Sequence, residues 1–193
     1  MIFTLIALVL MLIAVAAVVR SVDSSTTVIG NLAFRRDLTN RAELGIAKAL
    51  AVIKSGSLST ETAQMTDLPS ANYSATRLAS PSGGVGVPAV LVSNASYNTA
   101  TYSCIDGSGN ALSTCLPGSD GIVIRWVIDR QCVSGTTTTD TSACAYRKAD
   151  RDKGGSNSGA NRKPDGGTRA LFRISVRVTG PRSTETYIQT TAG

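Results

Sequence analysis

The chain has 193 residues, so at about 100–200 residues per domain it holds one domain plus an appendage rather than a two-domain enzyme. Its formal net charge is +6, but the lysines and arginines are scattered among acids, a pattern that does not favour nucleic acid as a partner. The sequence contains no histidine, which removes the usual general base and the commonest metal ligand, so we expect no catalytic residue, no metal site and no cofactor.

An apolar run, MIFTLIALVLMLIAVAAVV, opens the sequence; Thr4 is its only polar side chain, and Arg20 follows it. As a helix that rises about 1.5 Å per residue, this run nearly spans the roughly 30 Å core of a bilayer. A cleaved signal peptide is the alternative, but it would need a basic residue before a shorter apolar run, and none precedes this one. We therefore expect residues 1–20 to form the transmembrane half of an N-terminal helix.

Residues 21–54 have the pattern of an amphipathic helix that packs on a globular domain. Because residues 21–30 are rich in Ser, Thr and β-branched side chains, which are poor helix formers, a kink or local melting is expected near Gly30. The helix is expected to end at Ser55–Ser57. The packing stripe consists of apolar residues that recur every three or four positions: Phe34, Leu38, Ala42, Ile46, Ala49 and Ile53.

Residues 57–193 have the sequence pattern of a β domain, in which short runs of β-branched and aromatic residues alternate with the turn-forming residues Gly, Pro, Ser and Asn. Ile122–Ile128 and Phe172–Val178 each place apolar side chains at alternate positions, which predicts two strands with one apolar face each. A turn at Gly180–Ser183 then leads into Glu185–Thr191, so we expect an antiparallel hairpin to close the chain.

Other parts of this region give weaker signals. Ala71–Leu78 and Ala89–Val92 are further strand candidates, and the apolar-poor stretch Asp150–Gly167 is expected to be an exposed loop. The acids and amides of this loop do not have the spacing of a calcium-binding loop, and basic residues lie among them, so calcium is not expected. They are Asp150, Asp152, Asn157, Asn161 and Asp165.

Four cysteines lie in the Ser/Thr/Gly-rich part of the chain and form no Cys-x-x-Cys motif, which disfavours zinc. An even number of cysteines without metal spacing predicts two disulfides and an oxidising compartment. Three pairings are formally possible. We favour Cys104 with Cys115 and Cys132 with Cys144, because each pair closes a short loop around turn-forming residues.

Three stretches of this sequence resemble type IV pilins. Phe3–Ile6, FTLI, followed by Ala7 and Leu8, is similar to the FTLIEL start of mature pilins, with Ala7 in place of the glutamate. Residues 30–37, GNLAFRRD, and then 40–43, NRAE, resemble a passage of the PilX group of minor pilins. The closing residues 172–181, FRISVRVTGP, are similar to the last hairpin of that group.

The resemblance implies an α+β fold: a long N-terminal helix, transmembrane in its first half, packed on a small antiparallel β-sheet domain with disulfides. It implies a single-pass protein of the bacterial inner membrane, from which a leader before Met1 has been removed, and which then enters an extracellular pilus filament. The implied partners are other major and minor pilins, the inner membrane before assembly, and a tip adhesin. The helix residues that make these contacts are Met1, Phe3, Leu5, Ile6, Ala7 and Leu8.

The expected function is therefore that of a minor pilin, a structural or priming subunit and not an enzyme. Pilins commonly have a glutamate at the fifth position, which neutralises the N-terminal amine of the preceding subunit, whereas Leu5, or Ala7 in the FTLI register, is neutral here. This absence predicts a place at the tip or in the initiation complex. Two alternatives stay open: a neutral residue is tolerated anywhere in a filament, or the chain is an anchored periplasmic binding or adhesion module that enters no filament.

Overall fold

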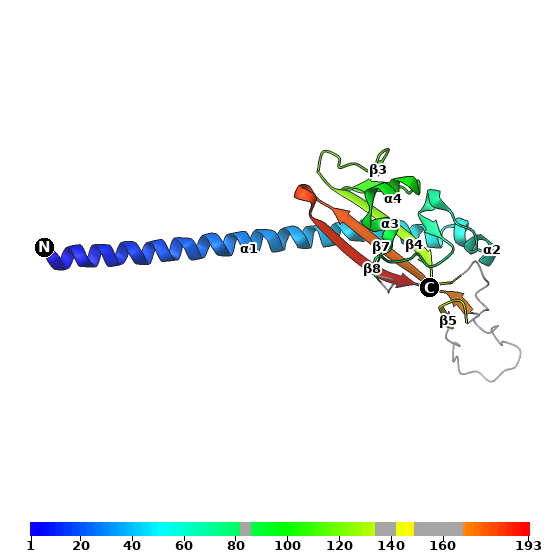
Figure 1. The fold of residues 1–193 in the computed structure, drawn as a ribbon, viewed down its shortest axis with the longest axis horizontal. Coiled ribbons are helices and arrows are strands. Elements are labelled where there is room, and N and C mark those ends of the chain that lie inside the picture. Colours follow the sequence, from blue (N-terminus) through cyan, green and yellow to red (C-terminus); the bar gives the residue numbers. More distant parts are fainter. Residues whose placement is uncertain (82–85, 134–141, 149–167) are drawn as a thin grey trace, which may run out of the picture. The chain divides into compact units, whose positions relative to one another are not determined.

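The computed structural model describes residues 1–81, 86–133, 142–148 and 168–193 (Figure 1). The chain divides into two compact units, Met1–Leu38 and Thr39–Gly193. Helix α1 (Ile2–Lys54) begins in the first unit and ends in the second, and all described strands belong to the second. The structure thus has the expected α+β layout of an N-terminal apolar helix followed by a largely antiparallel sheet.

Helix α1 continues through Gly30 without a break, so the kink or melting expected there is not found. Poor intrinsic propensity in residues 21–30 is overcome because extending an existing helix adds one hydrogen bond per residue and needs no new nucleation. Ser25 Oγ donates to Ser21 O at 2.9 Å, so this hydroxyl is satisfied inside the helix rather than competing with it. The helix ends at Lys54, directly before the expected stop at Ser55.

The second unit is built on one sheet. Strands β4 (Val123–Arg130), β7 (Phe172–Thr179) and β8 (Glu185–Ala192) are antiparallel neighbours, each eight residues long, which confirms the two strands and the closing hairpin predicted from the sequence. The order in the described sheet is β3-β2-β4-β7-β8, with β1 parallel to the end of β4. The short strands are β1 (Tyr73–Ser74), β2 (Cys104–Asp106) and β3 (Ala111–Leu112).

The last part of α1 covers one face of this sheet. A Cβ on Gly45 would lie 2.8 Å from Val176 Cγ1 and 3.0 Å from Ile124 Cγ2, so only a glycine lets the helix approach this closely. Ala42 and Ala49, three and four residues away on the same face, are fully buried. Small residues therefore bring the helix backbone down onto the apolar face of β4 and β7.

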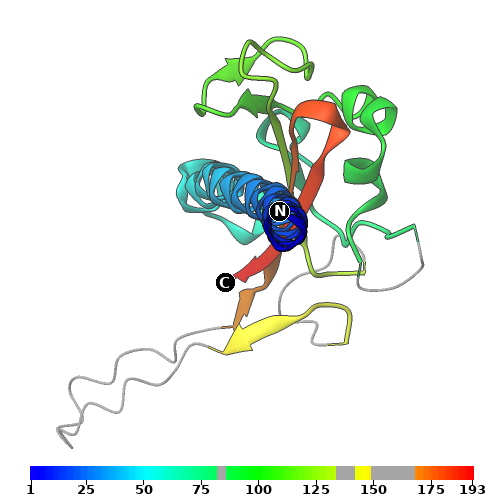
Figure 2. The same ribbon diagram turned by 90° about the vertical axis from the view of Figure 1, so that its left-hand side faces the viewer.

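The opposite face of the sheet is buried as well, although its strand residues include Arg173, Ser175 and Arg177. Helices α3 (Ala89–Val92) and α4 (Asn94–Thr99) cover this face, on the other side of the sheet from the last turns of α1 (Figure 2). Every residue of β4 is consequently buried. Alternation in the strands indicated one buried face but could not reveal this second covering layer.

Two weaker strand predictions need correction. Ala89–Val92 is helix α3, because Pro88 precedes its first turn and Leu91 is fully buried in the covering layer, so packing overrides β propensity. Of Ala71–Leu78, only β1 is a strand. The predicted loop at 150–167, with its calcium candidates, lies outside the described residues. The remaining described elements are η1 (Gly56–Leu58), α2 (Glu61–Gln64), η2 (Pro69–Ala71), β5 (Tyr146–Lys148), β6 (Thr168–Ala170) and η3 (Pro181–Ser183).

We expect removal of residues 1–25 to leave a soluble, folded protein. The sheet, both disulfides and the covering layer lie in the second unit, whereas the deletion removes the exposed apolar segment Ile2–Val22 and three further residues of α1. The shortened chain should elute as a monomer without detergent and melt cooperatively when followed by circular dichroism. Aggregation without detergent, or a melt without a transition, would contradict this expectation.

Candidate functional site

The chain leaves the start of α1 uncovered. Ile2–Val22, 21 residues, is long and apolar enough to cross a membrane, and none of it is buried within the structure. Monomeric soluble proteins rarely expose a continuous apolar surface of this size, which favours a partner such as lipid or another chain. The residues predicted to contact membrane or filament are all exposed in this structure: Met1, Phe3, Leu5, Ile6, Ala7 and Leu8.

This apolar segment has no carboxylate, since the first acid in the sequence is Asp23. Thr4, its one polar side chain, donates from Oγ1 to Met1 O at 2.6 Å and so is satisfied within the helix. The side chains of this segment therefore have no negative charge with which to compensate a positive group of a partner. They can interact with a partner only through apolar contacts.

The residues predicted to pack the helix on the domain differ in how deeply they are buried. Leu38 and Ala42 are buried, whereas Phe34, Ile46 and Ile53 are half-buried. The closest contact with the sheet is instead made at Gly45, which the apolar pattern did not single out. The signal that could have found it is the run of small residues at 42, 45 and 49, because residues three and four apart share one helix face.

Both disulfides have the pairing that loop length favoured: Cys104–Cys115 and Cys132–Cys144. The first encloses the β2–β3 hairpin, whose turn is held by Asp106. Hydrogen bonds from the Asn110 side chain and backbone, and from Ser108, lower the pKa of Asp106 below its ordinary value. The turn inside the first disulfide, predicted from the sequence, is therefore an ordered loop.

The same hairpin is tied to α1 and to the loop before β4. Arg41 Nη1 donates to Gly107 O at 2.8 Å, and Gly107 N donates to Asp120 Oδ2 at 2.8 Å. A Cβ on Gly107 would clash with both side chains, because it would lie 2.4 Å from Arg41 Nη1 and 2.5 Å from Asp120 Oδ2. A side chain at position 107 would therefore displace Arg41 and Asp120 from their hydrogen bonds with Gly107.

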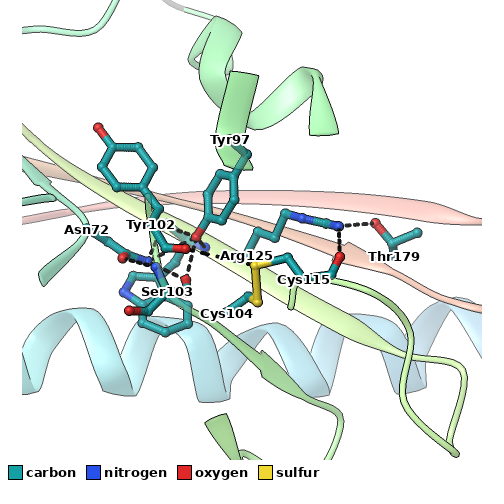
Figure 3. The surroundings of a disulfide bond; sticks show 9 residues. Asn72, Tyr97, Tyr102, Ser103, Cys104, Cys115, Arg125 and Thr179 are labelled. Atoms are coloured by element: carbon teal, nitrogen blue, oxygen red, sulfur yellow. Dashed lines mark hydrogen bonds between the residues drawn. A yellow bond between two sulfur atoms is a disulfide. The ribbon is translucent and has the colours of Figure 1, made fainter. Parts of the chain in front are cut away.

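A buried polar network joins the covering layer to the centre of β4 (Figure 3). Asn72 Nδ2 donates to Ser103 O at 2.7 Å and to Trp126 O at 2.9 Å, while Ser103 N donates to Asn72 Oδ1 at 2.7 Å. Tyr97 OH donates to Ser103 O at 2.7 Å and accepts from Trp126 N at 3.2 Å. Burial raises the pKa of Tyr97 far above its ordinary value, so the hydroxyl keeps its proton and can donate.

Three arginines of the second face donate to backbone carbonyls of helix α3 and of two loops. Arg173 Nη2 donates to Leu78 O at 3.0 Å, and Arg177 Nη1 donates to Leu91 O at 2.9 Å. Arg125 Nη2 donates to Cys115 O at 2.5 Å, next to the first disulfide (Figure 3). Each guanidinium therefore holds a different segment against the second face, which explains why β4 and β7 have arginines at buried positions.

Acids compensate two of these arginines. Asp129 accepts two hydrogen bonds from Arg173, at 2.9 Å and 2.7 Å, and this ion pair is buried. Arg177 pairs with Glu185 and lies opposite Arg125 in the sheet register. Burial and the neighbouring charge of Arg177 lower the pKa of Arg125.

The Glu185 interaction predicts acid-sensitive stability. Partial desolvation opposes ionisation of Glu185, but hydrogen bonds from Tyr187 and Arg177 and the charges of Arg177 and Arg125 outweigh it, so the pKa of Glu185 lies below its ordinary value. A carboxyl with a depressed folded-state pKa adds stability above its unfolded-state pKa of about 4.3, and this stability is lost as the pH falls through the folded-state value.

Glu185→Gln is therefore expected to lower the urea midpoint at pH 7. The difference from the unchanged protein should shrink below about pH 4 and vanish once Glu185 is protonated in both states. Urea titrations between pH 7 and acid, followed by tryptophan fluorescence, measure it. A midpoint difference that stays constant over this range would show that Glu185 acts through packing and not through its charge.

Within the ranges that the structure describes, no three His, Cys, Asp or Glu side chains gather as they would around a metal ion. No family model, curated protein or solved structure matches this chain. The likeness to pilins therefore depends on the residues quoted above.

Proposed function

We propose that this chain is a minor pilin, a structural or priming subunit of a type IV pilus or a related filament, and not an enzyme. The observation that supports this most is that Ile2–Val22 is completely uncovered in a chain whose second unit is a disulfide-bonded sheet domain. Such a helix can exchange lipid for the helices of other subunits, because both surroundings are equally apolar. The subunit would wait in the inner membrane, with its sheet domain in the periplasm, before entering an extracellular filament.

We place the subunit at the tip or in the initiation complex. The first 22 residues have no carboxylate, so the segment has nothing to neutralise the N-terminal amine of a preceding subunit. A buried unpaired charge costs several kcal/mol. A subunit that cannot compensate such an amine fits best where no subunit precedes it, next to other minor pilins and a tip adhesin.

Immunogold labelling of sheared filaments tests both parts of this proposal. Label at one filament end supports the tip position, and label along the shafts would contradict it while keeping the assignment as a pilin. Label confined to the membrane fraction would instead identify an anchored binding or adhesion module that enters no filament. Crosslinking to other minor pilins gives an independent readout.

An acid introduced near the N-terminus sharpens the test. Ala7→Glu, or Leu5→Glu if Met1 sets the register, supplies the missing carboxylate and should spread the subunit along the shaft. Leu8→Glu is the matched control, because it adds the same charge at a position that neither register uses. If both kinds of variant keep the tip position, the missing acid does not determine it.

A further inference from the structure

One arginine on the sheet face that α1 covers is buried without a partner. Arg130 is 0% exposed, and its Nε, Nη1 and Nη2 atoms have no hydrogen-bond acceptor within the ranges that the structure describes. The buried arginines of the second face differ, because each of them donates to a carbonyl or a carboxylate. They are Arg125, Arg173 and Arg177.

Apolar and aromatic side chains surround this guanidinium. Arg130 ends β4 and is in register with Phe172 on β7, and because side chains alternate along a strand it shares its face with Ile128. Tyr73 on β1 is in register with Ile128, and its ring packs edge-on against that of Phe172, with 6.1 Å between the ring centroids. All three neighbours are buried. The site is therefore closed to bulk water.

The acids at this end of the sheet are engaged elsewhere. The charges of Asp67 and Asp129 act on the Tyr73 hydroxyl, as does the charge of Arg130. Asp129 precedes Arg130 in the strand, so it points to the opposite face, where it accepts both hydrogen bonds from Arg173. Asp67 Oδ1 accepts from a backbone N–H at 2.7 Å. Neither carboxylate forms a hydrogen bond with Arg130.

The Tyr73 hydroxyl does not supply the missing negative charge. Burial raises the pKa of Tyr73 well above its ordinary value, although the charge of Arg130 opposes this shift. Tyr73 therefore keeps its proton, which it donates to Gln64 O at 2.6 Å. Arg130 does not become neutral either, because a guanidinium is not deprotonated in proteins. Without a counter-ion from solution, its buried charge would be strongly unfavourable.

We propose that Arg130 binds a small monovalent anion, chloride, inside the second unit. Chloride accepts N–H hydrogen bonds from any direction, so it can take the donors of one guanidinium and neutralise its charge. A water molecule accepts the same bonds but leaves the charge uncompensated. Larger anions such as phosphate do not fit, because the buried Tyr73, Ile128 and Phe172 close the surroundings. The stability of the unit then rises with the chloride concentration around it, whether or not the chain enters a filament.

Thermal melting of the full chain tests this in micelles of an uncharged detergent. Sodium gluconate, whose anion is too large for the site, is replaced stepwise by sodium chloride at constant ionic strength, and unfolding is followed by circular dichroism. An anion that binds only the folded protein raises the melting temperature as its concentration increases. We expect a rise of about 3–6 °C between chloride-free buffer and about ten times the dissociation constant of chloride.

Three variants connect this shift to the buried guanidinium. Arg130→Met keeps the length of the side chain without its charge, so it should lose the chloride-dependent shift. In chloride-free buffer it should melt above the unchanged protein, because no charge is then buried without a counter-ion. Arg130→Gln is also neutral and should lose the shift. The matched control is Arg36→Met, which removes an exposed arginine of α1 and should keep the full shift.

An equal chloride shift in the unchanged protein and in the Arg130 variants would overturn the proposal, because a general salt effect would then explain it. The absence of a shift in the unchanged protein would overturn it as well, and would show that the guanidinium is buried without a bound anion. If Arg130→Met does not fold, Arg130→Gln gives the same comparison. A shift in the unchanged protein and in Arg36→Met, and in neither neutral variant of Arg130, supports the site.

Discussion

Ile174→Asp is expected to unfold the second unit. Ile174 is fully buried and lies opposite Ile128 on β4 and Thr190 on β8, on the face that α1 covers. The substitution removes a large apolar side chain and buries a carboxylate. The buried guanidinium of Arg130 lies one register pair away on the same face, but an ion pair with it does not compensate for both the desolvation of the new charge and the lost apolar contacts. We expect a loss of about 5 kcal/mol or more, which is comparable to the whole stability of a typical domain.

Thermal melting followed by circular dichroism measures the effect, and two further variants calibrate it. Ser113→Asp adds the same charge at an exposed position outside the strands and should change stability by less than about 0.5 kcal/mol. Ile174→Val removes one methyl group and should cost about 0.5–1.5 kcal/mol. A native-like melting temperature for Ile174→Asp would mean that the face assignment of β7 is wrong.

Asp129→Asn is expected to be nearly as damaging, through a different mechanism. The Asp129 side chain is fully buried, accepts from Arg173 Nε and Nη2, and also accepts from Leu78 N at 3.0 Å. The amide keeps the shape but leaves the buried guanidinium of Arg173 without a counter-charge. Breaking a buried ion pair in this way costs about 3–5 kcal/mol.

Urea unfolding of a double-mutant cycle separates charge from shape. Arg173→Met alone should also be strongly destabilising, because Asp129 then stays buried and unpaired. Asp129→Asn combined with Arg173→Met should recover part of the loss, though not all of it, since the donors to Leu78 O and Gly86 O are gone as well. Additive losses in the double variant would show that the ion pair does not couple the two residues.

Local patterns were sufficient for the elements whose signal is contained within a few turns or one strand. An apolar run of helical length, a stripe with a period of three to four, and alternation over seven or eight residues each report the surroundings of one segment. These signals located α1, β4, β7 and β8 within two residues at each end. The favoured disulfide pairing also follows from local spacing, because short loops close with little loss of entropy.

Only the tertiary structure showed which segments pack against one another. The second buried face of the sheet, the helical state of Ala89–Val92 and the close approach at Gly45 all depend on contacts between residues distant in the sequence. The burial of Arg130 likewise follows from packing across the sheet and not from composition. By itself the sequence determined an apolar helix long enough to cross a membrane, an amphipathic helix and a disulfide-bonded β domain, because these are properties of single segments. The covering layer and the burial of Arg130 are properties of pairs of segments, so only the fold could determine them.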